Sequence, residues 1–145
     1  METTLEQTST LIAHDFVTKN TGVLDQEKID AAVKTITAET QSYPANGSVA
    51  SFIFYLKFQV NITGGKSFNG NAGGASTPGG GALIGDVYTS DINRLYKDTK
   101  SFQFNATPVY TSIIFFDGSS NVLGTFQAGA VSTVAGIGGG SGSWS

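Results

Sequence analysis

Cysteine is absent from the 145-residue chain, which excludes disulfide bonds, thiolate metal sites and a cysteine nucleophile. Histidine occurs once, at His14, so a catalytic base of this type has a single candidate. Charged residues are only 13% of the chain, and a net charge of −3 leaves no basic surface for nucleic acid. No apolar run reaches the ~18 residues that a membrane-spanning helix needs. The start, METTLEQTST, lacks the features of a secretory signal peptide, so none is visible in this chain.

Aromatic residues and glycine are abundant where charge is scarce. The chain contains ten Phe, five Tyr and 19 Gly, a composition that favours a β-rich protein of one ordinary domain. Seven of the eleven acids precede residue 41, whereas 17 of the 19 glycines follow Ile62. The sequence therefore predicts an acidic N-terminal extension at residues 1–40, followed by a compact module at residues 41–145.

The extension contains one segment with helical periodicity. Apolar residues recur at helical spacing in LDQEKIDAAVKTITAETQ, and Asp25 can cap the N-terminus, which predicts a helix from about 25 to 39. The preceding residues have no steady period, which favours a mobile leader containing His14. A poorly ordered extension throughout is the alternative.

The module has the alternation of β-strands. In SFIFYLKFQVNI, which follows the turn signal YPANGS, every second residue from Phe52 to Val60 is apolar, so a long strand is predicted there. Short β-type runs follow at spacings of about ten residues, and Asp117-Gly118 marks a hairpin. These features favour an all-β antiparallel sandwich or barrel. TSDINRLYKDT breaks the alternation and predicts a two-turn helix at about 90–98, with Thr or Ser as cap and Asp91 in the first turn.

The glycines do not form a nucleotide-binding loop. Gly65-Lys66-Ser67 resembles the end of a phosphate loop, but the required earlier glycine is replaced by Val60, and no helix pattern follows. In AGGASTPGGGALIGD the glycines alternate with strand-forming residues, unlike a flexible linker. They are better explained by a small closed barrel, whose strands bend sharply and pack across a narrow interior, with a turn at Thr77-Pro78-Gly79.

Catalytic and metal-binding constellations are lacking in the module. Its four acids are Asp86, Asp91, Asp98 and Asp117, and turn chemistry or helix-spaced charge pairing explains the last three. No Asp-rich loop offers an oxygen cage for a metal ion. We therefore expect no enzyme activity, no catalytic residue, no cofactor and no metal.

Three quoted segments carry a family resemblance. GGKSFNGNAGG, GGGALIGDVYTSDINRLYKDTKSFQFNA and IIFFDGSSNVLGTFQAGAVSTVAGIGGGSGSW resemble the virulence-associated proteins (Vap family) of pathogenic rhodococci, over residues 42–144. The resemblance implies a compact eight-stranded antiparallel β-barrel with Greek-key connections and one short helix at an end. It also implies a secreted or cell-surface protein that aids survival in macrophages, with binding to acidic lipids. The acidic extension does not look like the leaders of that family.

The resulting hypothesis is a monomeric, non-enzymatic, secreted virulence-associated protein that acts at a host membrane or on a host factor. Candidate contact residues are Tyr55, Tyr88, Tyr110 and Trp144, although barrel packing explains each of them more simply. The alternative is a small barrel that binds an apolar ligand in its mouth, or a protein partner.

Overall fold

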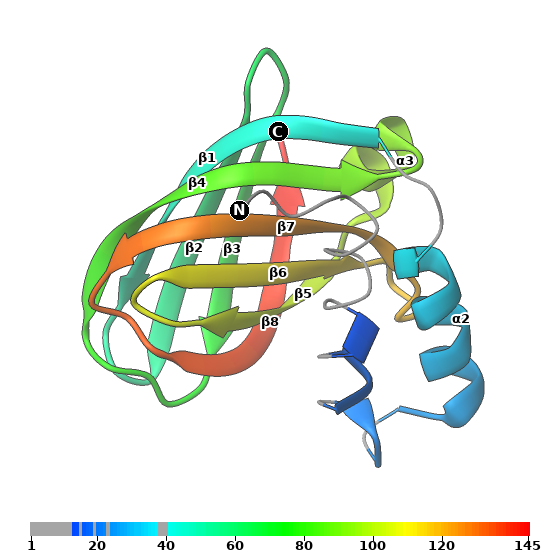
Figure 1. Ribbon diagram of the computed structural model, residues 1–145, viewed down its shortest axis with the longest axis horizontal. Helices are drawn as coiled ribbons and strands as arrows, with labels where there is room; N and C mark the ends of the chain where they lie inside the picture. The colour runs from blue at the N-terminus through cyan, green and yellow to red at the C-terminus, as the bar shows by residue number, and fades with distance from the viewer. Residues whose placement is uncertain (1–12, 15, 19, 23, 38–40) are drawn as a thin grey trace.

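Eight antiparallel strands form most of the protein (Figure 1). The computed structural model describes residues 13, 14, 16–18, 20–22, 24–37 and 41–145. The labelled helices are α2 (Gln26–Thr37) and α3 (Ile92–Asp98). The strands are β1 (Gln41–Ser51), β2 (Tyr55–Ile62), β3 (Ser67–Gly73), β4 (Gly79–Thr89), β5 (Ser101–Ala106), β6 (Tyr110–Phe116), β7 (Val122–Ser132) and β8 (Gly136–Trp144).

The strands close into a barrel in the order β1-β2-β3-β8-β5-β6-β7-β4. In each half of the chain, three consecutive strands are neighbours and the fourth returns beside the first, which is the Greek-key arrangement. The halves meet where β3 pairs with β8 and where β4 pairs with β7. The predicted eight-stranded antiparallel barrel with Greek-key connections is confirmed.

The interior of the barrel is filled by aromatic rings. The Phe58 ring centroid lies 4.8 Å from that of Phe104 and 5.5 Å from that of Phe102. Phe68 stands edge-on to Phe115 at 4.9 Å. These separations are typical of tilted and edge-to-face aromatic pairs, which add to the free energy gained by burying the rings. The alternating apolar residues of β2 from Leu56 onward therefore face the core, as the sequence indicates.

The start of the predicted long strand is wrong. Phe52 to Phe54 form a hairpin turn, in which the N–H of Phe52 donates to the carbonyl of Tyr55 at 2.8 Å and Ile53 has a φ of 78°. YPANGS is not a turn but part of β1, which is paired along its length with β4. The alternation of apolar residues continues through the turn, so periodicity alone could not locate the break.

Both predicted helices are present, with one corrected cap. α2 lies within the predicted 25–39, whose last two residues are outside the described part. In α3 the N-cap is Asp91 rather than Thr or Ser, and its Oδ1 accepts from the N–H of Arg94 at 3.1 Å. Leu95 on α3 is fully buried, so this short helix seals one end of the barrel.

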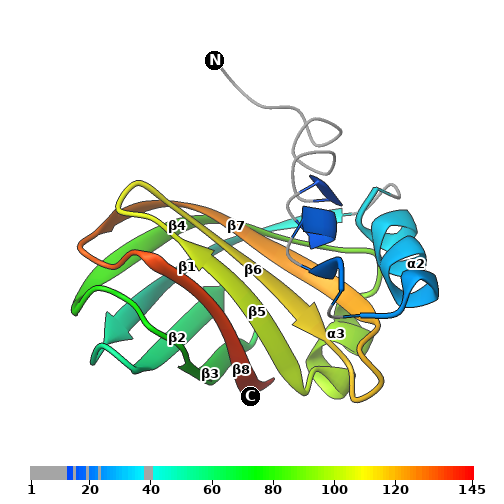
Figure 2. The same ribbon diagram turned by 90° about the horizontal axis from the view of Figure 1, so that it is seen from below.

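The N-terminal segment packs on the outside of the barrel (Figure 2). Phe16 is fully buried and its ring lies 6.0 Å from that of Phe116 on β6. Asn20 and Gln103 on β5 exchange hydrogen bonds of 3.1 and 2.9 Å between their side-chain amides. A second apolar cluster thus joins the segment and α2 to the outer faces of β6 and β7; its members are Ala13, Phe16, Ile29, Ala32, Ile114, Phe116 and Val122. The described residues of the extension are partly helical and pack on the barrel, and residues 1–12 lie outside the described part.

Truncating Phe16 should loosen this docked segment without unfolding the barrel. The change Phe16→Ala removes a buried ring and costs about 3 kcal/mol of packing. We expect faster amide hydrogen exchange in α2, measured by mass spectrometry, with exchange in β2 and β3 unchanged. The matched control is Val17→Ala, because Val17 is exposed on the same short segment. Equal protection of α2 in both variants would contradict the docking.

Steric crowding between β3 and β8 predicts unequal effects of alanine at two glycines that lie in neighbouring cross-strand pairs. A Cβ on Gly140 would collide with the backbone carbonyl of Asn71, whereas a Cβ on Gly73 would have nothing within 4 Å. We expect Gly140→Ala to lower the free energy of unfolding by about 2 kcal/mol or more. Gly73→Ala should change it by less than about 0.5 kcal/mol. Urea denaturation of both variants measures the difference, and similar values would show that the crowding is not real.

Candidate functional site

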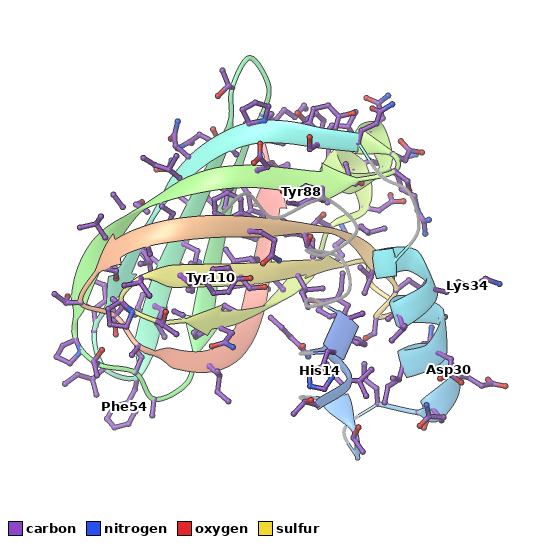
Figure 3. The ribbon with its side chains drawn as sticks, viewed as in Figure 1. His14, Asp30, Lys34, Phe54, Tyr88 and Tyr110 are labelled. Carbon is purple, nitrogen blue, oxygen red and sulfur yellow. The ribbon has the colours of Figure 1, made fainter. Side chains whose placement is uncertain are left out.

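The four candidate contact residues do not form one surface. Tyr55 and Tyr110 are exposed at the first residues of β2 and β6. Tyr88 is half-buried on β4, and Figure 3 shows it apart from Tyr110. Trp144 is buried in the core, where its ring centroid lies 5.3 Å from that of Phe115. Tyr55 and Tyr110 therefore remain the two candidates with a substantial exposed face.

Tyr88 has little capacity for acid–base chemistry at neutral pH. Burial raises the pKa of its phenol, and the negative charge of Asp86 raises it further. The phenol of Tyr110 donates to Oε1 of Gln127, whose Nε2 donates to Oγ of Ser112 at 2.9 Å. Tyr110 therefore takes part in a chain of hydrogen bonds between side chains of β6 and β7.

Among the described residues, the most exposed group of consecutive apolar side chains lies at the β1–β2 turn. We call Phe52, Ile53 and Phe54 the apolar tip; their exposed fractions are 63%, 46% and 73%. Figure 3 shows Phe54 at the end of the barrel far from α2. Other exposed apolar residues at the strand ends and loops of this part of the barrel are Val109, Val131 and Ile137.

Hydrogen bonds hold the apolar tip in place. The N–H of Ile53 donates to Oγ of Ser51 at 3.2 Å, and its carbonyl accepts from the N–H of Ser76 at 2.9 Å. The two hydroxyls of Ser51 and Ser76 are 2.6 Å apart and complete this link to the next loop. A positive φ is rare for a β-branched residue and persists only where the surroundings enforce it. The tip is thus a rigid projection whose apolar side chains are presented to solvent.

The sequence contained a signal for the tip that the strand prediction did not use. The run Phe52-Ile53-Phe54-Tyr55 is apolar on both faces of a strand, whereas β2 itself alternates with polar residues. A run of four large apolar residues next to a half-exposed strand is expected to be buried on both faces or to contact a binding partner.

Three acidic residues of the barrel, Asp91, Asp98 and Asp117, have structural partners. Asp117 in the β6–β7 loop accepts from the N–H groups of Ser119 and Asn121, both at 2.9 Å. Arg94 lies 3.5 Å from Asp117 and 3.6 Å from Asp98. Within the described ranges, no group of three or more His, Cys, Asp or Glu side chains could hold a metal ion. His14 is exposed on the docked segment.

Comparison with known proteins identifies the family. The family model described as Rhodococcus equi virulence-associated protein matches residues 2–145. The chain belongs to this family. The match extends over the acidic extension, beyond the predicted 42–144. No curated protein matches the chain.

Two solved structures of Vap proteins share the fold. The virulence-associated protein VapD from the intracellular pathogen Rhodococcus equi is 41% identical, with a TM-score of 0.72, and the match covers 74% of this chain and 100% of that chain. VapB from the same pathogen is 52% identical, with a TM-score of 0.69 and coverage of 74% and 98%. The barrel is thus the part that Vap structures share with this protein. No helix in the described residues has the length and apolar character needed to span a membrane.

The Asp117 loop predicts a pH dependence of stability. Burial alone would raise the pKa of Asp117, but hydrogen bonds from Asn121 and Ser119 and the charge of Arg94 hold it below its usual value. A carboxyl whose pKa is depressed by folding contributes stability above its unfolded pKa and loses it as the pH falls through the folded pKa. We expect Asp117→Asn to lower the free energy of unfolding by about 1 kcal/mol at neutral pH.

This deficit should disappear below the folded pKa of Asp117, because the wild-type carboxyl is then protonated as well. Denaturant titrations at several pH values measure it. Asp98→Asn is the control, since its exposed pair with Arg94 contributes little. A deficit that stays constant down to strongly acidic pH would contradict the assignment.

Proposed function

We propose that this Vap family member is a secreted protein that acts without catalysis, by bringing its apolar tip into contact with a host membrane to aid survival of the pathogen. The observation that carries the proposal is the projection of Phe52, Ile53 and Phe54 from one end of the barrel. Family membership supports the virulence role and the secreted or surface location. The filled aromatic interior favours contact through the outer surface over binding of an apolar ligand within the barrel.

The size of the tip sets the strength of this contact. Burying two Phe and one Ile from these exposures yields on the order of 4 kcal/mol. That corresponds to a dissociation constant of about 1 mM, weaker than the binding of a single myristoyl chain. The tip therefore supports brief, reversible membrane contact, and stable attachment needs a second interaction or several copies on one surface.

Vesicle flotation tests the membrane contact. Full-length protein is mixed with vesicles of phosphatidylcholine, with and without phosphatidylserine, at acidic and neutral pH and at lipid concentrations well above the expected dissociation constant. The double variant Phe52→Ser/Phe54→Ser should lose most of the floated protein, because it removes the two most apolar side chains of the tip. The control is Ile84→Ser, which alters a side chain on β4 that is 74% exposed but outside the tip.

Two results would overturn the membrane proposal: wild-type protein that floats with none of the vesicles, or a double variant that floats as well as wild type. In the first case the alternative of a protein partner at the tip gains support, and crosslinking from a photoreactive residue at position 54 in host cell extracts would then identify it.

A further inference from the structure

A polar groove of about 460 Å³ lies on the outer face of β1, β2 and β3. Its residues come from two rows that cross the three strands through the strand register. One row is Ser48, Gln59 and Asn69, and the other is Ala50, Lys57 and Asn71. Tyr55 lies at one end, and Phe58 and Gly70 complete the lining. The volume is in the range of about 300–1,000 Å³ that small-molecule sites occupy.

The strands hold the side-chain amides of the groove at regular spacings. Neighbours within a row are about 5 Å apart and the two rows about 7 Å, the spacings of a β-sheet. Gln59 and Asn69 are both exposed, so their side-chain amides are accessible to a ligand. Each amide can donate two hydrogen bonds and accept two. Because regular strands hold these groups, a ligand would meet a preformed array with little ordering cost.

Tyr55 adds an oriented aromatic face to the groove. Its phenol donates to Oδ1 of Asn71 at 2.7 Å, and its ring lies 6.1 Å from that of Phe52. These contacts fix the ring while 43% of the residue stays exposed. The Oδ1 contact also leaves both amide hydrogens of Asn71 directed away from Tyr55 and able to donate.

The charge in the groove is positive and unopposed. Lys57 is its single charged residue, no acid lines it, and no described acid lies within ion-pair distance of Lys57. Asp86 lies on β4, and Asp91, Asp98 and Asp117 lie around α3 at the other end of the barrel. The groove therefore complements a ligand with one negative charge beside many hydroxyl groups.

We propose that this groove binds an acidic saccharide, a sugar unit that carries a carboxylate next to its ring hydroxyls. Lys57 pairs with the carboxylate, the amides of Gln59, Asn69 and Asn71 bind the hydroxyls, and the Tyr55 ring covers an apolar face of the sugar. The proposal is independent of membrane contact by the tip. A glycolipid headgroup and a free polysaccharide both present this chemistry.

Nuclear magnetic resonance of the full chain tests the groove with a matched pair of sugars. Sialyllactose carries a carboxylate that lactose lacks, so sialyllactose should bind about fivefold more tightly, the effect of one exposed ion pair. The side-chain amide signals of Gln59, Asn69 and Asn71 should shift most. Equal affinities, or shifts that fall elsewhere on the barrel, would overturn the assignment.

Lysine variants separate the groove from general charge attraction. Lys57→Met should reduce the affinity for sialyllactose to that for lactose, whereas Lys100→Met, at an exposed residue before β5, should leave it unchanged. Asn71→Ala should lower the affinity for both sugars. Asn105→Ala on β5 should lower the affinity for neither. Circular dichroism confirms the fold of each variant. An equal effect of the two lysine changes would contradict the proposed pairing.

Two further probes distinguish the sources of the sugar. Phosphatidylcholine vesicles that contain a ganglioside present it as a headgroup, and hyaluronan oligosaccharides present it as a soluble polysaccharide. The Phe54→Ser variant removes the most exposed side chain of the tip and leaves the contact between the Phe52 and Tyr55 rings in place, so its binding to either probe reports the groove. Binding of one probe supports the proposed saccharide site and identifies the source of the sugar. If neither sialyllactose nor either probe binds, the proposal is overturned.

Discussion

The space required by the phenylalanine rings inside the barrel determines much of the rest of the structure. Phe68 and Phe102 fill the interior where β3, β5 and β8 meet, and a Cβ on the inward-facing Gly70 would approach their ring atoms to 2.6–2.8 Å. Glycine at such positions lets large rings and a narrow barrel coexist. Glycines on some strands leave the space that phenylalanine rings on neighbouring strands fill. This explains why the chain is rich in both residues.

The same closed barrel has two different apolar surfaces on its outside. One, around Ile114 and Phe116, is covered by the N-terminal segment and α2, and it behaves as a small second core. The other, the apolar tip, projects into solvent. Large exposed side chains in a rigid turn give the fold no stability, since they contact little of the protein. One apolar surface is thus covered by the chain itself, whereas the other stays bare at the end of the barrel where Tyr55 and the groove begin.

The fold was more predictable from the sequence than the surface. Alternation in β2, the Asp117-Gly118 hairpin and the spacing of α3 are local patterns, and each predicted its element correctly. The family resemblance supplied the strand number and connections. Periodicity missed the turn at Ile53, because a hairpin that reverses the chain can preserve alternation. The groove is not visible in the sequence, because register brings Ser48, Gln59 and Asn69 together from three strands. Docking of the extension likewise depends on contacts with distant strands.

The position of β8 in the closed barrel determines when the protein can complete its fold during translation. This strand, residues 136–144, is inserted between β3 and β5, and it joins the two Greek keys along one side. The N-terminal strands are synthesised first. β3 and β5 therefore each have one unpaired edge until β8 has left the ribosome. The barrel can therefore close only after translation of this strand. Before then the chain is an open sheet with two unpaired edges, which is the state most exposed to pairing with another chain.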